Sequence, residues 1–138
     1  MTLPVQLRRI EPMTIESWLF SAKRAWQDPW VKVVTIATTL FLLGGSGWFI
    51  ANMIALRHQV LGPIVLHYNI YVGVDALGAW GWIFLFPVVW LGMLMADFAW
   101  AFGVYREDVY QAWCFFFLAA VWSIPWMMAL WHLVKINQ

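Results

Sequence analysis

Three long runs of apolar residues, separated by short polar connections, dominate the chain. The run at 33–56 contains no charged side chain, the run at 80–102 holds only Asp97, and the run at 110–134 has none. An α-helix rises about 1.5 Å per residue, so each run can cross a hydrocarbon core about 30 Å thick. Strand-like alternation is absent from the runs, and a helix satisfies its own backbone hydrogen bonds in lipid. The pattern predicts an all-α integral membrane three-helix bundle with an outer loop at 57–79.

A shorter amphipathic pattern precedes the first run. Thr14 is a suitable N-cap, the apolar positions after it recur at helical spacing, and Asp28-Pro29 should end the helix. Basic helices with tryptophans on the apolar face are typical of segments that lie along a membrane surface. We therefore divide the chain into an interfacial segment, 1–31, and a membrane domain, 32–138; alternatively, the apolar face docks a partner. The apolar positions are Ile15, Trp18, Leu19, Ala22 and Trp26, and the expected interfacial anchors are Trp18, Lys23, Arg24, Trp26 and Trp30.

The basic residues predict the orientation, because Lys and Arg accumulate on the cytoplasmic side of membrane proteins. Five lie before the first run, namely Arg8, Arg9, Lys23, Arg24 and Lys32, whereas the first loop, the second turn and the tail hold one each. We expect the amino terminus to be cytoplasmic. The 57–79 loop and the carboxyl terminus then lie outside.

Composition supports the membrane class and excludes others. Of the 138 residues, 64% are hydrophobic, 19% aromatic and only 11% charged. Soluble domains carry about 25% charged residues, and disordered chains have few aromatics. A net charge of +1 does not favour a nucleic-acid binder, and the one cysteine, Cys114, excludes an intrachain disulfide.

The twelve tryptophans mostly fall near the two ends of the predicted spans, as aromatic belts do. Four lie deeper, where the indole ring should fill a helix interface or the N–H should find an acceptor. A pigment, quinone or lipid is the alternative partner for these rings. The four are Trp48, Trp90, Trp122 and Trp126.

Small residues and one acid mark the interior of the spans. The sequence Gly44-Gly45-Ser46-Gly47 predicts a packing face, because small residues let helices approach closely in lipid. Asp97 is a functional candidate, because a carboxylate inside a span is costly. It either approaches the interface or pairs with Lys32. Pro87 and Pro125 should kink or locally unwind the second and third spans.

The outer loop carries the most specific polar residues. His67, Asn69, Gly73 and Asp75 lie within one short connection, so we expect a folded loop that satisfies its own polar groups. A metal is the alternative, because three histidines and an acid share the outer side. These possible ligands are His58, His67, His132 and Asp75, although no close ligand spacing such as H-x-x-x-H is present.

The stretch His67-x-Asn69, followed by Gly73 and Asp75, resembles a short signature in the membrane domain of SdpI-type bacterial immunity and signalling proteins. The resemblance covers about fifteen residues of the loop at 61–78. Gly73 is displaced by one position from that signature, and Pro63 lies farther upstream than the usual proline. The resemblance implies a protein of the bacterial cytoplasmic membrane whose outer loop is a conformational or partner-binding element.

No motif for catalysis is present: the chain has no nucleophile elbow, phosphate-binding glycine loop or HExxH sequence. We therefore expect a non-catalytic accessory subunit that packs against other membrane proteins or against itself, with bound lipid. One alternative is an SdpI-like immunity or sensing protein whose outer loop binds a peptide or lipid-like ligand. The other is a subunit that binds a pigment, haem or metal.

Overall fold

The computed structural model describes residues 14–57, 62–69 and 71–138, so the expected contributions of Arg8, Arg9 and His58 lie outside the described residues. The elements are α1 (Ile15–Ala25), α2 (Pro29–Leu56), β1 (Ile64–Asn69), β2 (Gly73–Gly78), the 3₁₀ helix η1 (Trp80–Phe84), α3 (Leu85–Val104) and α4 (Val109–Asn137). Three helical segments are long and apolar enough to cross a membrane: Pro29–Leu56, Trp80–Val104 and Val109–Asn137. The predicted all-α membrane bundle is confirmed.

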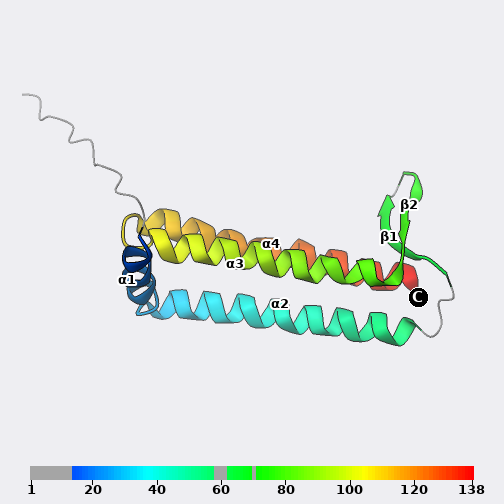
Figure 1. Ribbon diagram of the computed structural model, residues 1–138, viewed down its shortest axis with the longest axis horizontal. Coiled ribbons are helices and arrows are strands. Elements are labelled where there is room, and N and C mark those ends of the chain that lie inside the picture. Colours follow the sequence, from blue (N-terminus) through cyan, green and yellow to red (C-terminus); the bar gives the residue numbers. More distant parts are fainter. Residues whose placement is uncertain (1–13, 58–61, 70) are drawn as a thin grey trace, which may run out of the picture.

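The three spans run side by side, and the other elements lie at the two ends of the bundle (Figure 1). The short helix α1 lies across one end, next to the turn between α3 and α4, while the β1–β2 hairpin projects from the other. Helix α4 packs closely against both α2 and α3, which touch each other much less. The bundle therefore leaves the side of α2 that faces away from α4 uncovered by this chain.

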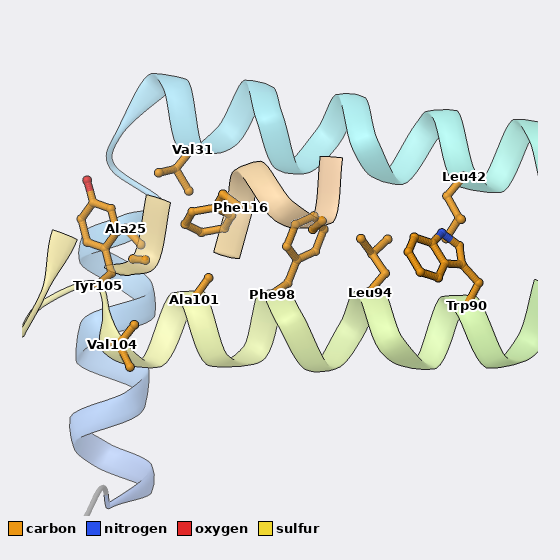
Figure 2. Packing of buried hydrophobic residues seen from close by; sticks show 12 residues of the cluster. Ala25, Val31, Leu42, Trp90, Leu94, Phe98, Ala101, Val104, Tyr105 and Phe116 are labelled. Carbon is orange, nitrogen blue, oxygen red and sulfur yellow. The ribbon is translucent and has the colours of Figure 1, made fainter. Parts of the chain in front are cut away.

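Aromatic and branched side chains fill the seam between the spans. Figure 2 shows Phe98 and Leu94 of α3 pointing toward α2, with Phe116 of α4 in the same layer. Trp90 is 5% exposed and stacks on Trp126 with ring centroids 5.0 Å apart. These two deep tryptophans fill the α3–α4 interface, as expected of buried indoles. Trp48 and Trp122, in contrast, are exposed on the outside of the bundle.

Local sequence signals explain where the first two helices begin. Thr14 accepts a hydrogen bond from the backbone N–H of Ser17, and the Ser17 side chain accepts one from the N–H of Thr14, which confirms the predicted cap. Asp28 caps α2 by accepting from the N–H of Trp30, and Pro29 occupies the first helical position. Proline suits that position because its missing N–H would have no partner there. The first span therefore begins at Pro29 rather than at residue 33.

The two prolines expected to disturb the spans lie in different settings. Pro87 is in the first turn of α3, where a backbone N–H has no partner within the helix, so it starts the helix rather than kinking it. Pro125 lies inside α4, which continues without a break in its helical assignment.

The outer connection is a β-hairpin, which the sequence patterns did not predict. β1 and β2 pair in antiparallel fashion from Ile64 opposite Gly78 to Asn69 opposite Gly73. Gly73 has φ +81°, a conformation that L side chains rarely adopt, and so supplies the return of the chain. Residues Ile64–Gly78 of the loop thus form a small two-stranded sheet.

Candidate functional site

Two irregularities in the hairpin bring its polar residues together. The register passes from Val65 opposite Leu77 to His67 opposite Ala76, and then to Tyr68 opposite Val74. Leu66 and Asp75 are therefore the extra residues of two bulges. A bulge turns a side chain away from its normal alternation. The second bulge places Asp75 next to His67. His67 lies opposite Ala76, which follows Asp75 in the chain.

His67 and Asp75 form a close pair at the surface of the hairpin. The distance from His67 Nδ1 to Asp75 Oδ1 is 2.6 Å, and the side chains are 64% and 37% exposed. It is the only ion pair within residues 14–57, 62–69 and 71–138. The carboxylate fixes the orientation of the imidazole and leaves Nε2 free to donate or accept a hydrogen bond. Of the other predicted loop residues, Asn69 and Gly73 pair with each other at the tip of the strands.

The hairpin is attached to the bundle by buried Ile64, which packs against the end of α4, and by hydrogen bonds to one residue there. The Asn137 side chain accepts from the N–H of Val65 at 2.9 Å and donates to the carbonyl of Val65, also at 2.9 Å. Its amide also donates to the carbonyl of Leu133, one turn back along α4. The Asn137 side chain therefore pairs with the backbone of Val65 in the way that a neighbouring strand would. The sequence pattern did not single out Asn137, although a lone amide near the end of an apolar span is a detectable signal.

An apolar groove lies where the hairpin meets the spans. One part, with a volume of about 250 Å³, has His67 on the hairpin side and His132 on α4, over a floor that includes Leu66 and Trp126. A second part, of about 280 Å³, shares Leu66, Phe86 and Trp126 with the first. The groove thus combines an apolar floor with a polar rim that carries two imidazoles. Such a combination can hold an amphipathic molecule, with the polar groups fixing its orientation.

The expected metal ligands do not form a cluster in the part of the chain that the structure describes. No group of three or more His, Cys, Asp and Glu side chains lies close enough there to hold a metal ion. His67 and His132 line the same groove, but Asp75 is not among the residues that line it. The fourth expected ligand, His58, lies outside the described residues.

The small-residue patch of α2 is divided between two faces. A Cβ at Gly45 would overlap the sulfur and terminal methyl of Met127 on α4, so this glycine faces α4 and any larger residue there would displace the Met127 side chain. A Cβ at Gly44 or Gly47 would meet nothing within 4 Å. Ser46 lies on the border, next to a groove between α2 and α3. Gly47 lines the same groove, so of the three glycines Gly44 is the one that has open space beside it and does not line that groove next to α3.

The helix expected to act as an interfacial anchor is also fixed to the bundle by hydrogen bonds. The indole N–H of Trp18 donates to the carbonyl of Ala99 on α3 at 2.8 Å. Buried Ser21 accepts from the backbone N–H of Arg106, at the turn between α3 and α4, at 3.0 Å. The contact between α1 and the rest of the bundle therefore includes Ser21, which the hydrophobic periodicity did not indicate as a buried residue. The large apolar residues Ile15, Leu19, Trp26 and Trp30 remain exposed.

A tyrosine and an aspartate lock the corner between α1 and α2. The hydroxyl of Tyr105 donates to Asp28 Oδ2 at 2.7 Å. This hydrogen bond is the main cause that lowers the pKa of Asp28, against the opposing effect of burial. Burial, with the same hydrogen bond and the nearby carboxylate charge, raises the pKa of Tyr105 to about 12. Both residues come from connections that the sequence places on one side of the membrane.

The intramembrane acid does not make the expected ion pair. Asp97 is half-buried on α3, but within the described residues no ion pair joins it to Lys32. Lys32 instead lines a groove beside α1. Lys32 and Asp97 remain apart because their helices, α2 and α3, contact each other much less than either contacts α4.

Comparison of the chain with models of protein families, with curated proteins and with solved structures gives no match.

Proposed function

We propose that the protein is a non-catalytic accessory subunit that packs against other membrane proteins, or against a second copy of itself, through the outer face of α2. The observation that carries this proposal is the composition of that face. Contact with lipid does not require small side chains, because long apolar side chains suit lipid at least as well. Close contact between helices does favour small residues. Exposed small residues recur there at helical spacing: Ala37, Gly44, Gly47, Ala51 and Ala55.

The packing of the chain supports the same proposal. The face that α2 turns toward α4 includes buried Leu42, Phe49 and Met53. The small residues lie on the opposite side, where Gly44 and Gly47 have open space beside them. A partner helix can therefore approach this face without moving any element of the bundle.

Substitution of the open glycines tests the proposal. A Gly44→Ile, Gly47→Ile double variant should fold, because both positions are open, but should lose association. Gly92→Ile is the matched control, since Gly92 is an equally open glycine on α3. The measurement is native mass spectrometry and co-purification from mild detergent. A stable monomer without partners in the wild-type protein would count against the proposal, and so would equal association of both variants.

A second candidate function rests on the hairpin. The paired His67 and Asp75, beside an apolar groove, support an SdpI-like immunity or sensing role in which the hairpin binds a peptide or lipid-like ligand. His67→Ala and Asp75→Ala should each weaken binding of a fluorescent amphipathic peptide to protein in nanodiscs. Lys135→Ala is the control, because Lys135 is exposed and does not line the groove. Binding that matches empty nanodiscs, or that survives both changes, would exclude this role.

We also propose that the protein lies in a bacterial cytoplasmic membrane with α1 on the cytoplasmic side. The basic residues of α1 and of the start of α2 support this orientation. Single cysteines at Val72 and Glu107, introduced after Cys114→Ala, would report the two ends of the bundle. An impermeant thiol reagent added to intact cells should label the cysteine at position 72 and not that at position 107. Labelling of both, or the reverse pattern, would contradict the layout.

A further inference from the structure

A groove at the α1 end of the bundle has a composition unlike the rest of the surface. It lies between α1, the start of α2 and the end of α3, with a volume of about 570 Å³. Its polar lining consists of Lys23, Gln27 and Lys32. None of the residues that line it is acidic. The groove therefore offers two positive charges and an amide donor to an incoming group.

Neither lysine forms an ion pair with the part of the chain that the structure describes, because no carboxylate there lies within ion-pair distance of Lys23 or Lys32. Two acids of the neighbouring elements do not line the groove. Asp28 accepts from Tyr105 and caps α2, and Asp97 lies farther along α3. An anion in the groove would thus meet two free ammonium groups and no opposing carboxylate.

The remaining lining is apolar and includes three aromatic rings, of which the two indoles make defined contacts. Trp18 is fixed by its hydrogen bond to the carbonyl of Ala99. Trp26 contacts Phe102 with ring centroids 6.2 Å apart at an interplanar angle of 52°. Indole rings and ammonium groups at the same depth are typical of the headgroup region of a bilayer. The groove therefore pairs a cationic rim with an apolar wall that continues onto the spans.

The position of the groove identifies the occupant. Helix α1 crosses the end of the bundle (Figure 1), and Lys32 is only three residues beyond Pro29, where α2 begins. The lysines therefore lie at the depth of lipid phosphates. We propose that this groove binds the phosphate of an anionic phospholipid from the leaflet on the side of α1, with the acyl chains against α2 and α3. This site is independent of the partner proposed for the outer face of α2.

Lipid selectivity in native mass spectrometry tests the site. The full chain in detergent is titrated with phosphatidylglycerol or with phosphatidylcholine of the same acyl chains. Wild-type protein should prefer the anionic lipid. Removal of one lysine near an anionic headgroup reduces affinity about fivefold, so a Lys23→Gln, Lys32→Gln double variant should lose roughly 30-fold. The corresponding double arginine variant keeps both charges and should retain binding.

Arg24→Gln provides the matched control, because it removes one positive charge from α1 at a residue that does not line the groove. Because Arg24 is itself an expected interfacial anchor, its loss should reduce the affinity by at most about fivefold, far less than the double lysine variant. The proposal is overturned if Arg24→Gln lowers the affinity as much as the double lysine variant does. It is also overturned if that double variant retains the preference of the wild type while its mass and helical content show a folded protein.

A third arm separates lipid from a free anion. Inorganic phosphate, added at the same concentration as the lipid, should neither bind detectably nor displace phosphatidylglycerol. If inorganic phosphate binds as well as the lipid, and both lysine changes abolish its binding, the groove is an anion site and not a lipid site. Equal binding of the two lipids would also refute the proposal.

Discussion

Replacement of Asn137 by alanine should release the hairpin from α4 while leaving the three spans folded. The Asn137 side chain makes both of its contacts to the hairpin at Val65, accepting from its N–H and donating to its carbonyl. Alanine removes both bonds without adding bulk. The groove that contains His67 and His132 depends on this attachment, because one imidazole lies on β1 and the other on α4.

The magnitude follows from the two bonds. Each neutral hydrogen bond contributes about 1 kcal/mol to stability, so their loss should cost about 2 kcal/mol of hairpin docking. That free energy corresponds to a roughly 30-fold shift in the opening equilibrium. The bond from Asn137 to Leu133 lies within α4 and does not hold the hairpin. An Asn137→Asp variant keeps the acceptor for the N–H of Val65, but it places a carboxylate oxygen against the carbonyls of Val65 and Leu133, so it should open the hairpin at least as much as alanine does.

Amide hydrogen exchange in nanodiscs measures this opening directly. The N–H of Val65 should exchange roughly 30-fold faster in Asn137→Ala, whereas amides in the middle of α4 should be unaffected. Gln138→Ala is the control, since Gln138 bonds only to exposed Lys135. Unchanged exchange at Val65 in Asn137→Ala, or equal acceleration in Gln138→Ala, would refute the reasoning.

Two further predictions concern the corner and the helix seam. Because the folded state raises the pKa of Tyr105 from 10.0 to about 12, the neutral phenol contributes stability that is complete below about pH 10 and is lost as the pH rises through about 12. Ultraviolet titration, with Tyr105→Phe as the reference, should show this late ionisation, and Asp28→Asn should lower its midpoint only in part because burial is the larger cause. In the seam, Gly45→Ile should wedge α2 away from Met127 and destabilise the fold by about 1–3 kcal/mol in chemical unfolding. Gly44→Ile should not, and equal losses would contradict the assignment of the two faces.

The sequence pattern was sufficient to predict that lipid surrounds this protein and that three helices cross it. Apolar runs of sufficient length, with charges confined to the connections, permit helices in lipid and little else. Capping was also legible, because Thr14 and the Asp28-Pro29 pair act on backbone groups within a few residues. These features depend on local chemistry alone.

The hairpin was not predicted from the sequence pattern. Its strands are short, and two bulges break the alternation that marks a strand. Gly73 adopts a positive φ at the return of the chain, but this role appears only with the opposite strand in place. The pairing of His67 with Asp75 likewise depends on the bulges and not on sequence spacing.

Which helix faces meet becomes clear from the packing in three dimensions and not from the sequence pattern. Helices α2 and α3 make few contacts with each other, so Lys32 and Asp97 do not form an ion pair. Lys32 lines the groove beside α1 instead. The same order divides neighbouring glycines, so that Gly45 packs against Met127 while Gly44 faces outward. In lipid, apolar surface is no guide to the interior, because the surroundings are as apolar as the seam. The choice among faces therefore depends on the fit of side chains and on a few hydrogen bonds, which become visible only in three dimensions.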